Sequence, residues 1–168
     1  PSAMGKRVLL VDAVLRRAGG SVNSMSEDAT PGLSEVLAGT SPAMDAVEKD
    51  EELGFSIVHA GESRISPVAL LSADRIKAVI DRLAADHDIV IIDGPPIMGL
   101  ADAVLLARNV EAVLVVVEAN RTRASDLDLA VSRLPQHTVM GGVITKFDPK
   151  SAGVTYGGYD YYTYQQQS

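Results

Sequence analysis

Apolar runs recur along the chain, and each is followed by turn residues or by the start of a helix. The runs consist of consecutive Val, Ile and Leu residues with no polar alternation between them. Strands of this kind are typical of a parallel sheet that helices cover on both faces. The pattern therefore predicts strands at 7–12, 55–61, 88–94, 112–119 and 140–147.

Helical periodicity fills two of the intervals between these runs. Residues 72–86 begin with Ser72 as the candidate N-cap, and residues 122–134 form the second helix. The predicted buried faces consist of Ile76, Val79, Ile80 and Leu83 in the first helix and Leu127, Leu129, Ala130 and Leu134 in the second. This alternation predicts an α/β fold, doubly wound, with a mainly parallel sheet, helices on both faces and one domain at 5–149.

The remaining segments lack this periodicity. Residues 17–31 are small and polar and indicate a loop, 32–39 a short helix, and 41–52 an acidic, solvated surface segment. From Lys150 onward the chain has no apolar period, so 150–168 is predicted to be a flexible tail. All five tyrosines lie in that tail.

Composition narrows the classes of function. The chain has 168 residues, 46% hydrophobic and 22% charged, which indicates a globular domain. A net charge of −7 argues against a nucleic-acid surface, because phosphate binding requires clustered Lys and Arg. The absence of cysteine excludes a thiolate metal site, and no apolar run reaches the roughly 18 residues of a membrane span. These features predict a cytoplasmic protein.

Two predicted strands end in aspartate, namely VLLVD at Asp12 and IVIID at Asp93. Ligands of open α/β sheets bind at the carboxyl ends of the strands, where a carboxylate can hold Mg²⁺ or its waters beside a phosphate. The alternative is that each aspartate only caps the turn that follows. Arg16 and Arg17 are either bidentate phosphate ligands or solvated surface residues.

The last predicted strand runs into Thr145, Lys146, Phe147 and Asp148. A Thr/Asn-Lys-x-Asp sequence after a buried strand is the pattern with which many GTPases read guanine. The alternative is a turn that carries a surface lysine and a surface aspartate.

Several of these segments together resemble the bacterial protein-tyrosine kinase (BY-kinase) domain. The resemblance is carried by VLLVDAVLRR, PGLSEVLAG, IVIIDGPP, GLADAVLLA and the tyrosine-rich tail, from about Lys6 to Tyr164. It implies a P-loop fold related to MinD and ParA. It also implies the cytoplasmic part of an exopolysaccharide or capsule assembly system, at the inner face of the membrane and with a membrane activator or co-polymerase as partner.

The resemblance also implies site residues and cofactors. Asp12 would associate with Mg²⁺ and act as general base, Asp93 would be the Walker B aspartate, and Arg16 would complete the catalytic group. Thr145, Lys146 and Asp148 would contact the nucleotide base, with ATP and Mg²⁺ as cofactors. Neighbouring copies in a ring would phosphorylate the tail in trans. The implied acceptors are Tyr156, Tyr159, Tyr161, Tyr162 and Tyr164.

Two departures from the family pattern bear on activity. The phosphate loop G-x-x-x-x-G-K-[ST] does not occur in the sequence, and Val14 replaces the second aspartate of D-x-D-x-R. A central strand, this loop and one helix are therefore expected to be missing before Arg7. The alternatives to an active kinase are a pseudokinase that serves as a phospho-acceptor, a MinD- or ParA-like ATPase switch, and a GTPase.

Overall fold

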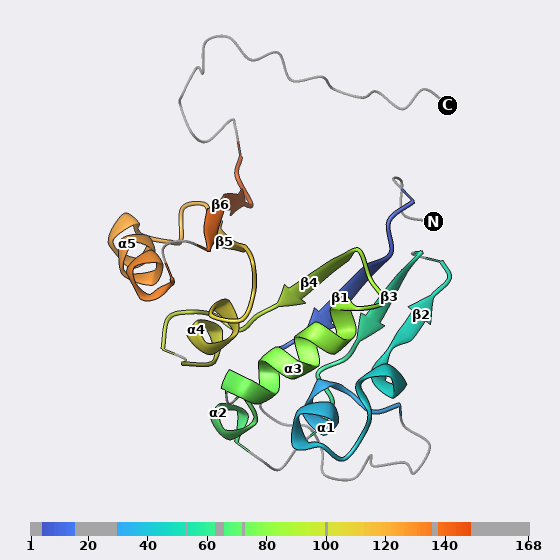
Figure 1. Cartoon of the computed structure of the whole chain (residues 1–168). Helices are drawn as coiled ribbons and strands as arrows, with labels where there is room; N and C mark the ends of the chain where they lie inside the picture. The colour runs from blue at the N-terminus through green and yellow to red at the C-terminus, as the bar shows by residue number, and fades with distance from the viewer. Residues whose placement is uncertain are drawn as a thin grey trace, which may run out of the picture.

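Two hydrogen-bonded sheets carry the fold (Figure 1). The first has the strand order β2-β3-β1-β4 and the second consists of β5 and β6. The strands are β1 Val8–Asp12, β2 Glu48–Asp50, β3 Phe55–Val58, β4 Ile89–Asp93, β5 Val113–Glu118 and β6 Val139–Thr145. The computed structural model describes residues 5–15, 30–52, 54–62, 66–71, 73–99, 101–135 and 138–148.

Parallel pairing dominates both sheets. β1 pairs in parallel with β3 and β4, and β5 pairs in parallel with β6, whereas β2 is antiparallel to β3. The α/β class and the mainly parallel pairing are therefore confirmed. The predicted acidic segment 41–52 contains more structure than expected, because it folds into a short 3₁₀ helix and the edge strand β2.

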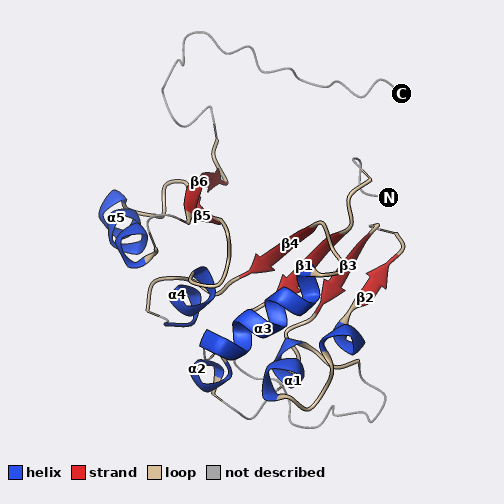
Figure 2. Cartoon of the chain, in the orientation of Figure 1, coloured by secondary structure: helices blue, strands red, loops and turns tan. Residues whose placement is uncertain are grey.

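The helices alternate with the strands along the chain (Figure 2). Their bounds are α1 Leu33–Ala38, η1 Ala43–Ala46, α2 Pro67–Leu70, α3 Ala73–Ala84, α4 Ala101–Ala107 and α5 Ala124–Arg133. None of the helices that the structure describes has the length and apolar character needed to cross a bilayer. The predicted tail, 150–168, lies outside the described residues.

The core lies between the four-stranded sheet and the helices α1, α2 and α3, which Figure 1 shows on one side of that sheet. Leu9 and Val11 of β1 are buried against them. The predicted buried face of α3 is confirmed, since Ile76, Val79 and Leu83 are buried and Ile80 packs against the same cluster. Ala130 of α5 and Leu134, which directly follows that helix, are buried, but Leu129 is 44% exposed, so its predicted burial is wrong.

A carboxylate fastens the start of α1 to the loop that follows β3. The Glu35 side chain accepts hydrogen bonds from the backbone N–H of Gly32 at 2.8 Å and from that of Glu62 at 2.9 Å. A Cβ on Gly32 would collide with the backbone of Gly61, so the two loops approach as closely as glycine allows. The approach fixes α1 over the carboxyl end of β3.

Four strand edges have no partner among the described residues, namely those of β2, β4, β5 and β6. Of these strands, β4, which pairs only with β1, and β5, which pairs only with β6, consist almost entirely of Val, Ile and Leu. Alternate residues on both strands are exposed although the sequence shows no polar alternation there. Ile89 and Ile91 of β4 are 46% and 52% exposed, and Leu114 and Val116 of β5 are 53% and 63% exposed. Apolar strands with open edges are unusual, since unpaired N–H and C=O groups beside apolar side chains favour the addition of a further strand.

Candidate functional site

The two predicted aspartates lie side by side at the carboxyl edge of the four-stranded sheet. Asp12 is the last residue of β1, Asp93 is the last residue of β4, and the two are register partners. Neighbouring strands lie about 4.8 Å apart, and partnered residues of parallel strands point to the same face. The fold thus brings together two carboxylates that are 81 residues apart in the sequence.

Local hydrogen bonds hold this edge. The backbone N–H of Ala13 donates to the Asp93 carbonyl at 2.9 Å, which extends the β1–β4 ladder past Asp12. The N–H of Val14 donates to Oδ1 of Asp12 at 3.0 Å. Asp12 therefore shapes the turn after β1, as the capping alternative predicts, and also lies at the sheet edge. Asp93 is exposed, and its carboxylate has no hydrogen bond or ion pair to the described part of the chain.

The aspartate pair lies on the face of the sheet opposite α1 and α3. In β1, Leu9 and Val11 face the helices, so Asp12 lies with Leu10 on the other face. In β4 the same alternation places Asp93 with the exposed Ile91. A ligand at this edge would therefore lie over the exposed apolar face and not among the helices.

A second polar group lies where β5 and β6 end. Thr145 is the register partner of Glu118, and its hydroxyl donates to the Val117 carbonyl at 3.1 Å. Nζ of Lys146 lies 3.1 Å from Oε1 of Glu118, and Nη1 of Arg121 lies 3.3 Å from Oε2. The hydrogen bond from Lys146 is the main reason why the pKa of Glu118 is lowered. The lysine is held against β5, with its own backbone in the left-handed region at φ +54°.

The predicted base-contacting residues are thus only partly grouped. Thr145 and Lys146 join one cluster with Glu118, while Asp148 is exposed on the loop after β6. No hydrogen bond or ion pair recorded for the described residues connects this cluster with Asp12 and Asp93, which belong to the other sheet.

Other predicted site residues lie outside the described part of the chain. Arg16 is one of them. The predicted phospho-acceptors Tyr156, Tyr159, Tyr161, Tyr162 and Tyr164 also lie outside it.

Sequence reasoning missed two carboxylates. Glu118 ends an apolar strand just as Asp12 and Asp93 do, so the same rule would have found it. Asp102 lies in the first turn of α4, after the loop that leaves β4, and is 2% exposed. An acid before the apolar run VLLA, where a helix begins, was the available signal for Asp102.

The donor set fits a magnesium nucleotide in part. Mg²⁺ in nucleotide sites usually takes one or two carboxylates and completes its shell with waters and phosphate oxygens. Asp12 and Asp93 meet that need, and no group of three His, Asp or Glu side chains that could enclose a metal occurs within the described residues. A cradle of backbone N–H groups for the phosphates is the part that the sequence lacks, since the phosphate-loop motif is absent from it.

No family model matches the chain, but similar proteins are numerous. Tyrosine-protein kinase ptk of Acinetobacter johnsonii is 33% identical over 150 residues, which cover 88% of this chain and 20% of that protein. Tyrosine-protein kinase etk of Escherichia coli K12 is 33% identical over 147 residues, which cover 84% and 20%. This chain therefore spans about a fifth of the curated relatives that it matches.

Solved structures agree with these relatives. The kinase domain of Escherichia coli tyrosine kinase ETK superposes with a TM-score of 0.75 at 28% identity, over 93% of this chain and 62% of that one. Cobyrinic acid a,c-diamide synthase of Mycobacterium smegmatis, solved with ADP and magnesium, gives 0.62 at 25% identity over 88% and 65%. The resemblance predicted from the sequence is confirmed.

Proposed function

We propose, from the homology of this chain to the kinase domains of bacterial tyrosine kinases, that it forms part of a tyrosine autokinase-like domain. This domain would transfer phosphate from ATP to tyrosines of the tail in trans and thereby regulate exopolysaccharide polymerisation or export. The observation that carries the proposal is the register of Asp12 and Asp93 at the carboxyl edge of one parallel sheet. Two carboxylates at such an edge suit a magnesium nucleotide.

The proposed roles follow from position. Asp93 is exposed and has no partner among the described residues, so it is available to orient Mg²⁺ through water. Asp12 would accept the proton of the incoming tyrosine hydroxyl while that oxygen bonds to the γ-phosphorus and ADP leaves. Arg16 would pair with phosphate oxygens. Bound Mg²⁺ would neutralise charge on the phosphates, since this reaction depends mainly on positioning and charge.

The phosphate loop must come from a segment that this sequence does not contain. The open edges of β4 and β5, both lined with exposed apolar side chains, suit one added parallel strand. A loop at the carboxyl end of such a strand would reach the edge that Asp93 shares with Asp12. We therefore place the missing strand between β4 and β5, with the phosphate loop at its carboxyl end.

The cluster at the end of β5 and β6 is the proposed base-contacting region. Lys146 is oriented by Glu118, and the Thr145 hydroxyl is used in a bond to the Val117 carbonyl. Asp148 follows on the exposed loop. We propose adenine as the base, because the homology is to ATP-dependent protein kinases and the TKFD pattern alone is short.

The proposed partners are neighbouring copies of this domain in a ring and a membrane activator of the polysaccharide system, at the inner face of the membrane. The tail would supply acceptors, and each phosphate would add about −1.5 to −2 charges to an already acidic protein. Repeated phosphorylation would therefore favour dispersal of the ring by repulsion between neighbouring copies.

A second candidate function is a pseudokinase that active subunits phosphorylate. It is favoured by two features, the absence of the phosphate-loop motif and the valine at position 14. A nucleotide switch is the third candidate. It rests on fold alone, since the MinC:MinD complex of Aquifex aeolicus matches with a TM-score of 0.58 at 18% identity.

Two measurements test the proposal. We expect the chain alone to bind ATP·Mg²⁺ weakly or not at all in calorimetric titration, because the backbone cradle for the phosphates is missing. Incubation with an active BY-kinase domain and labelled ATP should then place phosphotyrosine in the tail. A micromolar dissociation constant for the chain alone would contradict the need for a phosphate loop. An unlabelled tail would contradict the acceptor role.

A further inference from the structure

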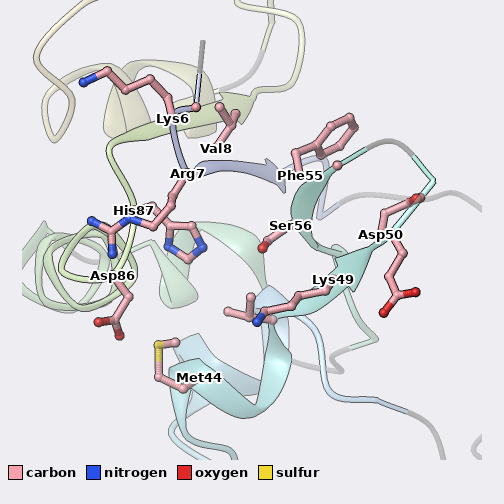
Figure 3. A pocket seen from close by; sticks show the side chains of 14 residues that line it. Lys6, Arg7, Val8, Met44, Lys49, Asp50, Phe55, Ser56, Asp86 and His87 are labelled. Atoms are coloured by element: carbon pink, nitrogen blue, oxygen red, sulfur yellow. The ribbon is translucent and has the colours of Figure 1, made fainter. Parts of the chain in front are cut away.

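The charged groups at the amino-terminal edge of the four-stranded sheet favour no single class of ligand. A pocket of about 650 Å³ opens at this edge (Figure 3). Cationic and acidic side chains line it together, namely Lys6, Arg7, Lys49, Asp50, Glu51 and Asp86. The carboxyl edge of β5 and β6 differs, because its charges are arranged around one carboxylate, that of Glu118.

Both oxygens of the Glu118 carboxylate have a cationic partner. Nζ of Lys146 lies 3.1 Å from Oε1, and Nη1 of Arg121 lies 3.3 Å from Oε2. With Oε2 held by Arg121, Oε1 is directed at Lys146. The hydrogen bond from Lys146 is the main cause that lowers the pKa of Glu118, so the carboxylate is charged at neutral pH.

The backbone joins the two turns that carry these groups. The N–H of Ala119, which follows β5, donates to the carbonyl of Thr145, the last residue of β6, at 2.9 Å. Asn120 and Lys146 both have a left-handed backbone, at φ +60° and +54°. No other non-glycine residue within the described part of the chain has a positive φ. Both left-handed residues therefore lie in turns at one edge of one sheet.

The conformation of Lys146 does not serve stability. A left-handed backbone is unfavourable for lysine, because the Cβ atom crowds the following carbonyl oxygen. The ion pair with Glu118 returns little free energy, since the side chains of Lys146 and Glu118 are 70% and 31% exposed. The backbone strain therefore exceeds what the ion pair offsets. Strained residues of this kind cluster at functional sites.

The ion pair fixes the direction of the Lys146 side chain and leaves most of that side chain accessible. The methylene stem of a lysine packs on apolar surface, and its ammonium is attracted to the face of an aromatic ring. A purine offers such a face. The inference rests on the proposed function, in which Lys146 contacts adenine. We propose that Glu118 is a positioning residue of the base-contacting region, which holds Lys146 in an orientation that lets its stem pack against the base.

Adenosine tests contact with the base alone, because it carries no phosphate and does not require the phosphate loop. Titration of the ¹⁵N-labelled full chain with adenosine, followed by NMR, should give saturable shifts at Ala119, Thr145 and Lys146. Glu118→Gln keeps the size of the side chain and removes its charge. It should weaken adenosine binding about two- to fivefold, the range of an exposed ion pair. Glu111→Gln is the matched control and should change nothing, since Glu111 is exposed before the other end of β5.

A double variant shows whether Glu118 acts through the lysine. Lys146→Met should weaken adenosine binding at least as much as Glu118→Gln, and the addition of Glu118→Gln to Lys146→Met should cause no further loss. Additive losses would overturn the inference, since Glu118 would then act by another route. Unchanged affinity in Glu118→Gln would also overturn it, and the assignment of the base-contacting region would stand. The absence of saturable shifts in the unmodified chain would overturn that assignment and this inference together.

Discussion

The two sheets differ in how completely their faces are covered. In the four-stranded sheet, Leu9 and Val11 lie in a cluster with side chains from α1, α2 and α3. In β5 and β6 every residue is at least partly exposed, and Leu114 and Val116 are more than half exposed. The first sheet has a core of its own, whereas the second leaves strand surface that a further element would have to cover.

The polar groups at the carboxyl edges of the two sheets also differ, in this case in how their charges are paired. Asp12 and Asp93 put two acids side by side, and no cation among the described residues is recorded at Asp93. At the other edge, Glu118 is balanced by Lys146 and Arg121. An acid pair favours a divalent cation, while a balanced cluster holds its lysine in a fixed orientation. This difference is the reason why we propose metal and phosphate at the first edge and the nucleotide base at the second.

Removing one carboxylate of the Asp12–Asp93 pair tests the carboxyl edge of the four-stranded sheet. This change should give the largest effect of all, on phosphorylation activity. In a longer form that carries a phosphate loop, Asp93→Asn should lower autophosphorylation by about 10²-fold or more, the size typical of lost charge stabilisation in a transition state. Incorporation of labelled phosphate measures this, and circular dichroism should be unchanged because Asp93 is exposed. Activity near that of the unmodified protein would remove Asp93 from the site.

Because the two sheets are buried to different extents, the same leucine-to-alanine substitution should lower the free energy of unfolding by different amounts in each sheet. Leu9→Ala removes a fully buried side chain and should lower the free energy of unfolding by about 2–5 kcal/mol. Leu114→Ala removes a half-exposed one and should cost about 1 kcal/mol or less. Urea unfolding followed by circular dichroism measures both. Similar costs would mean that β5 is covered in solution.

Much of this comparison was accessible from the sequence, and the reasons for the rest are physical. Consecutive Val, Ile and Leu located β1, β4 and β5, and helical spacing identified the buried face of α3, because both patterns are local. The place of Asp12 and Asp93 at strand ends followed from the same apolar runs. Their pairing in register depends on which strands become neighbours, and it did not follow from those runs. Nor did the exposure of Leu129, since it depends on which helix face finds a partner.

Contacts between distant loops had no sequence signal at all. The bonds from Glu35 to the N–H groups of Gly32 and Glu62 depend on how α1 approaches the end of β3. The pairing of Lys49 with Ser56 depends on a three-residue edge strand inside an acidic segment. Short elements like β2 form through tertiary pairing, so local patterns do not predict them.

An ion pair between the residues that directly precede β1 and β4 adds a smaller, pH-dependent contribution to the stability of the four-stranded sheet. Arg7 donates to Asp88 through its guanidinium, 3.1 Å from Oδ1, and through its backbone N–H, and these hydrogen bonds lower the pKa of Asp88 from 3.8 to about 2. The folded-state pKa lies below the unfolded one, so Asp88 stabilises the fold above about pH 4. That contribution is lost as the pH falls toward 2.

Asp88→Asn should therefore reduce the dependence of unfolding free energy on pH between about 4 and 2. The effect should be small, because both side chains are partly solvated. Urea titrations at several pH values measure it. Asp81→Asn, which removes an ion pair within α3, is the matched control and should leave the slope due to Asp88 in place. An unchanged slope in Asp88→Asn would show that Arg7 does not hold this carboxylate in solution.

Removing the tail should have the smallest effect on stability. The same deletion also tests whether the tail covers the exposed surface of either sheet. The segment from Tyr156 to Ser168 has glycines, glutamines and no apolar period, so little burial is available to offset the entropy of ordering it. Deleting it should leave the thermal midpoint almost unchanged. The same deletion should remove nearly all phosphotyrosine after incubation with an active kinase domain, but this follows trivially, since no tyrosine lies elsewhere. Hydrogen exchange is the sharper measurement. Fast exchange across 156–164 is expected, whereas slow exchange there, together with a lower midpoint on deletion, would mean that the tyrosines pack on the exposed strands and are structural.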